Sequence, residues 1–112
     1  MILTTYMIKM KKEYKLPRSI VRACSGILEG VKKEPYIQYI AEVEKEIGTK
    51  LYEGNEKRRE NFVKAIELNI INNRENTFDM LDRKYELSVS LATFKRHKYK
   101  FCWLLAKKCG FI

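Results

Sequence analysis

The chain lacks the features that membrane and secreted proteins require. It has no apolar run that approaches the length of a membrane span, which takes about 18 consecutive apolar residues. The apolar stretch at residues 1–8 is short, and its positive charges follow it, whereas a secretory signal has the opposite order. We therefore expect no membrane partner and a cytoplasmic protein.

The sequence also lacks the cysteine and histidine spacing of metal sites and an even set of cysteines for disulfides. The three cysteines, Cys24, Cys102 and Cys109, are odd in number, and none belongs to a CxxC pair. Cys102 and Cys109 would lie about two turns apart on one helix face, which is too far for a disulfide. His97 is the only histidine. We expect reduced, mostly buried thiols, no metal and no cofactor.

The sequence has no recognisable catalytic arrangement. It has no second histidine, no strained serine elbow and no glycine-rich phosphate loop. Glu42, Glu44 and Glu46 alternate, and on a helix that spacing distributes them over different faces. These carboxylates are typical of a solvated surface, so we expect that the protein is not an enzyme.

The composition predicts a single globular domain with an all-α fold. Of 112 residues, 46% are hydrophobic and 33% are charged, which is typical of a folded chain. Apolar residues recur at intervals of three and four, and no alternating Val/Ile/Thr-rich stretch indicates strands. We expect one domain over residues 1–112 with about five helices. Residues 16–73 would form a helical support for the helix-turn-helix segment at residues 77–112. They would also provide a candidate homodimer interface.

Local signals place the ends of these helices. Pro17 lies in the first turn of the first helix, and Asn55 is a candidate N-cap. Gly30 marks a candidate helix end and Gly48 a candidate C-cap. The expected helices run from about residue 17 to 30, 36 to 47, 56 to 71, 78 to 85 and 91 to 109. The cluster Lys57-Arg58-Arg59 is interpreted as a solvated helix start, with a second phosphate contact as the alternative.

Positive charge is concentrated in the last third of the chain. The net charge is +9, and residues 77–112 hold eight Lys/Arg against three Asp/Glu. Residues 91–109 hold no acid and six basic residues: Lys95, Arg96, Lys98, Lys100, Lys107 and Lys108. A solvated helix normally mixes signs to gain i,i+4 pairs. We therefore expect a polyanionic partner outside the chain, with an ordinary solvated surface as the alternative.

A helical wheel separates the last helix into two faces. The predicted core face carries Leu91, Phe94, Phe101, Cys102, Leu105 and Cys109. The opposite face carries Arg96, Lys100, Trp103 and Lys107, flanked by Lys95 and Tyr99. Trp103 has a second interpretation, in which it packs against an earlier helix or a partner subunit. Lys98 falls inside the apolar face, so either its side chain reaches past the helix edge or the helix is rotated.

The start of this helix carries the candidate DNA-binding site. Ser90 is a candidate N-cap that would accept a bond from the N–H of Ala92 or Thr93. Leu91 and Ala92 are candidates for thymine methyl groups, Arg96 for guanine, and Lys95, Lys98 and Lys100 for phosphates. The predicted site for double-stranded DNA is Ser90, Leu91, Ala92, Thr93, Lys95, Arg96, Tyr99 and Lys100.

Residues 77–112 carry four short motifs in order, which are Thr77-Phe78-x-x-Leu81, Ser90-x-x-Thr93-Phe94-x-Arg96, Leu104-Leu105-Ala106 and Cys109-Gly110-Phe111. In these motifs the segment resembles the C-terminal helix-turn-helix of small phage transcription regulators of the RinA/ArpU type, which is similar to region 4 of sigma-70 factors. Ser90 follows Leu81 by nine positions where about seven are usual, so either the turn is longer or the cap is Ser88. The resemblance implies promoter or operator binding, often as dimers, and action beside RNA polymerase.

Two other functions fit the same basic helix. The first is a protein-interaction module that docks on RNA polymerase or on another phage protein. The second is an accessory in DNA packaging or replication that uses the helix for a structural task. Steep salt dependence of DNA binding would distinguish a DNA-binding protein from the interaction module. Transcription with and without the protein would distinguish a regulator from the accessory.

Overall fold

The computed structural model describes residues 16–30 and 33–112, and it is all-α over these ranges. The apolar stretch at residues 1–8 lies outside the described residues. Five helices are present and no strand occurs in the described ranges, which confirms the predicted fold class. The helices are α2 (Arg18–Gly30), α3 (Tyr36–Glu46), α4 (Glu56–Ile71), α5 (Phe78–Tyr85) and α6 (Leu91–Lys108).

Side-chain caps fix the starts of the last three helices. Asn55 Oδ1 accepts the N–H of Arg58 at 3.2 Å, as predicted, and Thr77 Oγ1 accepts the N–H of Met80 at 3.3 Å. Such bonds satisfy N–H groups that have no partner inside the helix. The predicted C-cap of α3 is one residue late, because Ile47 caps the helix and Gly48 follows it.

Gly48 nevertheless meets two requirements at the end of α3. Its φ of +73° lies in the left-handed region that side chains disfavour. A Cβ at this position would lie 3.1 Å from Cδ2 of Phe62, closer than ordinary contact allows. Glycine therefore permits both the reversal of the chain after α3 and the close approach of α4.

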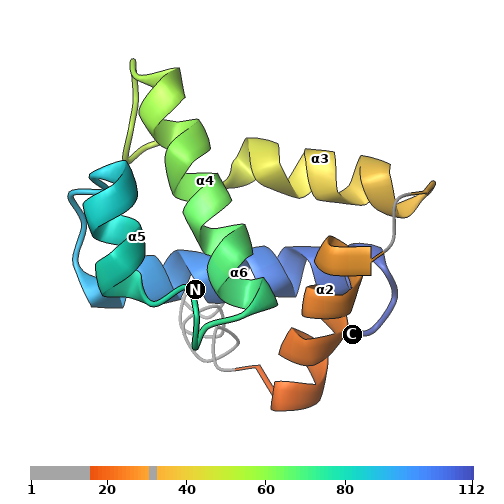
Figure 1. Ribbon diagram of the computed structural model, residues 1–112. Coiled ribbons are helices and arrows are strands. Elements are labelled where there is room, and N and C mark those ends of the chain that lie inside the picture. Colours follow the sequence, from red (N-terminus) through yellow and green to blue (C-terminus); the bar gives the residue numbers. More distant parts are fainter. Residues whose placement is uncertain (1–15, 31–32) are drawn as a thin grey trace, which may run out of the picture.

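Helices α4 and α6 form the centre of the fold, and α4 crosses α6 (Figure 1). Helix α4 contacts α2, α5 and α6, while α6 also contacts α2 and α3. The largest fully buried side chains come mostly from these two helices and from the segments that follow α3 and α5; they are Phe62, Phe94, Phe101, Ile47, Ile66, Leu87 and Leu105. The α6 helix is therefore held by the rest of the chain along its length.

An aromatic cluster attaches the first half of α6 to α4 and α5. The ring of Phe62 lies 5.2 Å from the ring of Tyr52, 6.1 Å from Phe94 and 5.3 Å from His97, measured between centroids. The ring of Phe94 lies 5.2 Å from that of Phe78. Tilted and edge-to-face ring pairs add stabilisation beyond the burial of their area. This cluster sets the rotation of α6 about its axis, and thus which side chains face outward.

His97 predicts how stability changes with pH. Burial lowers the pKa of His97, and the charges of Lys100 and Arg96 lower it further, although the bond to the Thr93 carbonyl raises it. The unfolded chain therefore takes up a proton at a higher pH than the folded chain. We expect the free energy of unfolding to fall as pH drops from about 6.5 through the folded pKa.

Denaturant unfolding at pH 7.5 and at acidic pH measures this effect. The His97→Gln variant serves as the control, because His97 is the only histidine. The variant should lose the part of the pH dependence that lies above the range in which carboxylates titrate. An identical pH dependence in the two proteins would contradict the account.

The three cysteines are free thiols, as predicted. Cys24 and Cys102 are buried, and Cys109 is half-buried. The thiol of Cys24 donates to the carbonyl oxygen of Cys102 at 3.4 Å, which joins α2 to α6.

None of the helices in the described ranges combines the length and the apolar character that a membrane crossing demands.

Candidate nucleic-acid interface

The first half of α6 exposes one continuous face. Its members are Ala92, Lys95, Arg96, Tyr99 and Lys100, which are spaced i, i+3, i+4, i+7 and i+8. Side chains at these intervals lie on one side of a helix. Ala92, Lys95 and Arg96 are exposed, and Tyr99 and Lys100 are partly exposed. We call these five residues the α6 outer face.

The remaining three predicted site residues lie at the beginning of α6. Ser90 Oγ accepts the N–H of Thr93 at 3.1 Å and donates to Thr93 Oγ1 at 3.0 Å. The guanidinium of Arg96 donates to the same Thr93 oxygen at 3.3 Å. Ser90 is therefore the N-cap, and the alternative cap Ser88 is wrong. The bonds connect the cap, Thr93 and Arg96 on successive turns of the helix.

Leu91 is exposed, contrary to its predicted place in the core. Its side chain is 46% exposed, whereas Phe94, one turn later, is 1% exposed. Phe94 is the first α6 residue in the buried cluster, so the helix meets the core only after its first turn. The other predicted core positions Phe101, Cys102 and Leu105 are buried, and Cys109 is half-buried. The predicted core face of the wheel is therefore correct apart from Leu91 at the helix start.

The turn between α5 and α6 is organised by local hydrogen bonds. Glu86 and Ser88 adopt positive φ values of 52° and 59°. The Asp82 carboxylate accepts the N–H of Leu87 at 3.1 Å and that of Ser88 at 3.4 Å. Leu87, between them, is 1% exposed. The turn thus places the apolar side chain of Leu87 in the core.

The start of α4 and the segment before it hold this turn from outside. The Arg58 guanidinium donates to the Glu86 carbonyl at 2.7 Å and to Ser88 Oγ at 2.8 Å. The Tyr52 hydroxyl donates to the carbonyl oxygen of Leu87 at 2.6 Å. Burial raises the pKa of Tyr52, so its hydroxyl remains a donor at neutral pH. Sequence reasoning missed both residues as supports of the turn.

The interpretation of the Lys57-Arg58-Arg59 cluster as a solvated helix start is wrong for its two arginines, which bond within the chain. Arg59 donates to the carbonyl oxygens of Glu44 at 2.7 Å and Ile47 at 2.9 Å, and it pairs with Glu56. Arg58 bonds to the α5–α6 turn, as described above. These guanidiniums therefore bond to carbonyl groups at the end of α3 and in the α5–α6 turn, where the regular backbone hydrogen bonding of the helices ends. Of the three residues in this cluster, only Lys57 is exposed.

Removal of the Tyr52 hydroxyl provides a test of the turn. We expect Tyr52→Phe to lower the free energy of unfolding by about 1–3 kcal/mol, because the buried Leu87 carbonyl loses its donor. Tyr39→Phe is the matched control, since no hydrogen bond involves that hydroxyl among the described residues. Urea denaturation of both variants measures the difference. Equal losses in the two variants would show that the Tyr52 bond does not stabilise the turn.

The six cations of α6 fall into distinct environments. Lys95, Arg96 and Lys100 lie on the outer face and have no acidic partner within the described ranges. Lys108 pairs with Glu42 of α3 at 2.8 Å, and this contact lowers the pKa of the carboxyl. The prediction that all six cations have partners outside the chain is therefore wrong for Lys108. The partner-free cations of the outer face are concentrated in the first three turns.

The α6 outer face ends at Lys100, because most residues in the second half of α6 are buried. Trp103, predicted for the exposed side, is only 9% exposed, in agreement with its second interpretation as a packing residue. Lys107 lies over its ring, with Nζ 4.7 Å from the ring centroid. Lys98 is 8% exposed, so it lies in the apolar face as the wheel placed it. Neither proposed explanation holds, because its side chain is buried and the core face is not rotated, and Lys98 is not part of the α6 outer face. A ligand on the outer face thus meets residues 91–100 and not the whole helix.

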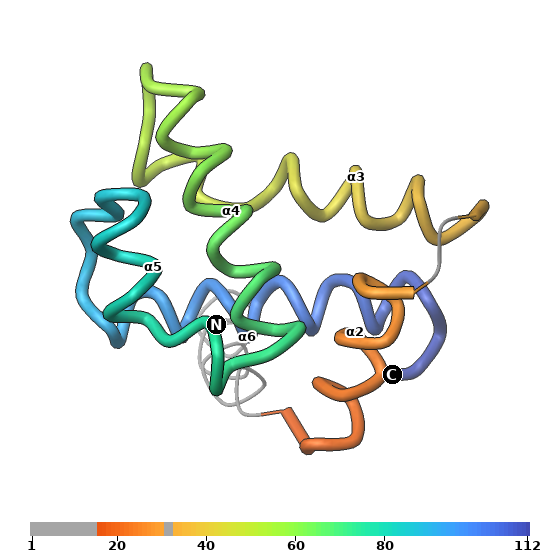
Figure 2. Tube along the Cα trace, in the orientation of Figure 1, coloured from red at the N-terminus to blue at the C-terminus, as the bar shows by residue number. Residues whose placement is uncertain are grey.

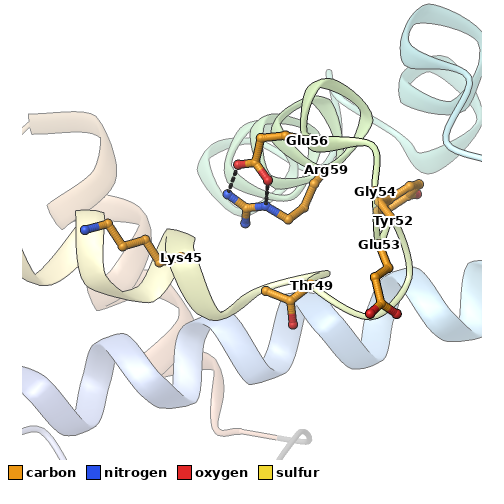
Figure 3. A pocket seen from close by; sticks show the side chains of 7 residues that line it. All are labelled: Lys45, Thr49, Tyr52, Glu53, Gly54, Glu56 and Arg59. Carbon is orange, nitrogen blue, oxygen red and sulfur yellow. Dashed lines mark hydrogen bonds and ion pairs between the residues drawn. The ribbon is translucent and has the colours of Figure 1, made fainter.

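A separate pocket of about 330 Å³ lies between the end of α3 and the start of α4 (Figure 3). The carboxylate of Glu56 and the guanidinium of Arg59 face each other there at 2.7 Å. Lys45 points away from this pair (Figure 3). Because the carboxylate of Glu56 and the guanidinium of Arg59 are paired with each other, neither is an unpartnered charged group in this pocket. We therefore do not choose the pocket as the candidate functional site.

Within the part of the chain that the structure describes, no group of three or more His, Cys, Asp or Glu side chains is placed to hold a metal ion. Comparisons with models of protein families, with curated proteins and with solved structures find no match for this chain. The geometry of α5, the turn and the α6 outer face is therefore the basis for a functional proposal.

Proposed function

We propose that this chain is a sequence-specific DNA-binding transcription regulator, encoded by a phage or prophage. In this proposal α5, the turn and α6 form a helix-turn-helix, and α6 is the recognition helix. The observation that supports it most is the α6 outer face, which presents three cations without acidic partners on a helix that contains no acid. The major groove of B-DNA admits an α-helix, and its phosphates attract such charges.

The individual side chains suit different parts of the groove. Arg96 carries the fork that matches guanine O6 and N7, and its bond to Thr93 orients it. Lys95 and Lys100 lie on either side of it along the helix and are assigned to phosphates. Leu91 and Ala92, both exposed at the helix start, are assigned to thymine methyl groups. Tyr99 supplies a hydroxyl at the same face.

Residues 16–73 supply the support, and we propose that they also form a homodimer interface. Helices α2 and α3 contact α6 directly, and α4 contacts both α5 and α6, so these helices fix how the recognition helix is presented. Dimeric helix-turn-helix proteins bind two half-sites one helical turn of DNA apart. A homodimer therefore predicts a palindromic site, and RNA polymerase is a further candidate partner at a promoter.

Selection from a library of random DNA duplexes tests this proposal. A sequence-specific protein should enrich a common site, and a duplex with that site should bind more tightly than a scrambled one. Transcription from a template with the site, with and without the protein, then tests regulation. Binding without enrichment would favour the packaging or replication accessory. Absence of binding even in dilute salt would contradict DNA binding and favour the protein-interaction module.

A further inference from the structure

A cavity of about 710 Å³ lies between the first turns of α2, the end of α4 with the segment after it, and the middle of α6. These three parts of the chain can be followed in Figure 2. Among the described residues, all charged side chains that line the cavity are basic: Arg18, Arg22, Arg74 and Lys98. No Asp or Glu of residues 16–30 or 33–112 lines it. The volume is within the range of small-molecule sites.

Lys98 is a buried cation without a counter-ion among the described residues. Its side chain is 8% exposed, and it forms no hydrogen bond or ion pair within those residues. Its Nζ lies 5.7 Å from the ring centroid of Tyr99, which also lines the cavity. Burial lowers the pKa of Lys98 because desolvation disfavours its charged form. Proteins usually offset such burial with a paired acid, and the described lining of the cavity offers none.

The three arginines extend this positive charge across the opening of the cavity. Arg18, Arg22 and Arg74 are exposed, and their side chains make no hydrogen bond or ion pair with any described residue. The side chains of four arginines make no hydrogen bond or ion pair with any described residue, and three of them line this cavity; the fourth, Arg83, is exposed on α5. A guanidinium has a planar set of donors that matches phosphate oxygens.

The walls of the cavity are fixed by polar contacts within the chain. Ser25 Oγ donates to the carbonyl oxygen of Ile71 at 3.2 Å, which ties α2 to the end of α4. Asn69 Nδ2 donates to the carbonyl oxygen of Asn76 at 2.7 Å, which ties α4 to the segment before α5. The walls of the cavity are therefore fixed before any ligand arrives, which reduces the entropic cost of binding.

We propose that this cavity binds a phosphate group, with Lys98 at its buried wall and Arg18, Arg22 and Arg74 at its opening. A small phosphorylated molecule and a phosphate of the DNA backbone offer the same chemistry. The second source rests on the proposed DNA-binding function, since Tyr99 belongs to both the α6 outer face and the cavity lining. The site for a small molecule does not depend on that function.

Isothermal titration of the full chain with inorganic triphosphate tests the first source. The Lys98→Met variant should bind triphosphate about tenfold or more weakly, because a charged hydrogen bond is lost. The same variant should melt at an equal or higher temperature, because it removes an uncompensated buried charge. Arg22→Gln combined with Arg74→Gln should weaken binding without replacing any buried side chain. Lys57→Met, which removes an exposed charge that does not line the cavity, is the control.

Titration of the same variants with duplex DNA tests the second source. If triphosphate does not bind but Lys98→Met lowers duplex affinity more than Lys57→Met does, the ligand is a backbone phosphate. If triphosphate binds, Lys98→Met weakens that binding more than Lys57→Met does, and the chain has no affinity for DNA, the cavity proposal stands while the proposed function fails. If Lys98→Met and Lys57→Met bind triphosphate equally well, the cavity is not the triphosphate site. The proposal is overturned if triphosphate does not bind and Lys98→Met affects duplex binding no more than the control does.

Discussion

Phe94→Ala is expected to lower the free energy of unfolding by about 3–5 kcal/mol, the loss typical of a large buried aromatic residue. The Phe94 side chain is 1% exposed. Its ring lies 6.1 Å from that of Phe62 in α4 and 5.2 Å from that of Phe78 in α5. The substitution removes two ring contacts and leaves a cavity where the three helices meet. Urea denaturation at neutral pH measures the change.

Leu91→Ala is the matched control for this prediction. Leu91 lies one turn earlier on the same helix, and it is 46% exposed. Its truncation should cost less than about 1 kcal/mol, because little apolar area leaves the core. Similar losses for the two variants would show that α6 is rotated relative to the arrangement described, and the composition of the outer face would then be wrong.

Arg96→Ala is expected to lower affinity for the selected DNA site by about 1–3 kcal/mol, which is about 5- to 150-fold. Arg96 is exposed, and its side chain bonds only to Thr93 among the described residues. Its loss should therefore leave the melting temperature unchanged. Because Arg96 is assigned to a guanine, the variant should also discriminate less among base pairs at one position of the site.

Lys57→Ala controls for the loss of one positive charge. Lys57 is exposed on the first turn of α4 and does not belong to the α6 outer face. Fluorescence anisotropy with the selected duplex and with single-base-pair variants measures both affinity and discrimination. If Arg96→Ala and Lys57→Ala lose the same affinity and keep the same base preference, Arg96 contacts phosphate or nothing and does not read a base.

The positions of the helices follow from local signals, which is why the sequence predicted them. Asn55 and Ser90 each accept an N–H three residues later, as their types and places suggested. Apolar residues at helical intervals indicated α4 and α6, and the core positions Phe94 and Phe101 are confirmed. These features depend on residues within one or two turns of each other, so one chain segment carries the whole signal.

The supports of the candidate site depend on contacts between distant segments, which local patterns do not encode. Arg58 reaches Ser88 across 30 residues, and Lys108 reaches Glu42 across 66. A basic residue at a helix start or end looks the same whether it faces solvent or a carbonyl group. The environment of Lys98 likewise arises only where α2, α4 and α6 meet. The sequence placed this charged residue on an apolar helix face, but it could not predict the basic cavity beside it.

Salt dependence of duplex binding tests the central claim that the α6 outer face binds DNA. Affinity is measured over a range of salt concentrations for the wild-type chain and for a Lys95→Ala, Lys100→Ala double variant. Each phosphate contact contributes about one to the slope of log affinity against log salt. The account predicts a steep wild-type slope that becomes shallower by about two in the double variant. Equal slopes for the two proteins, or no binding in dilute salt, would contradict it.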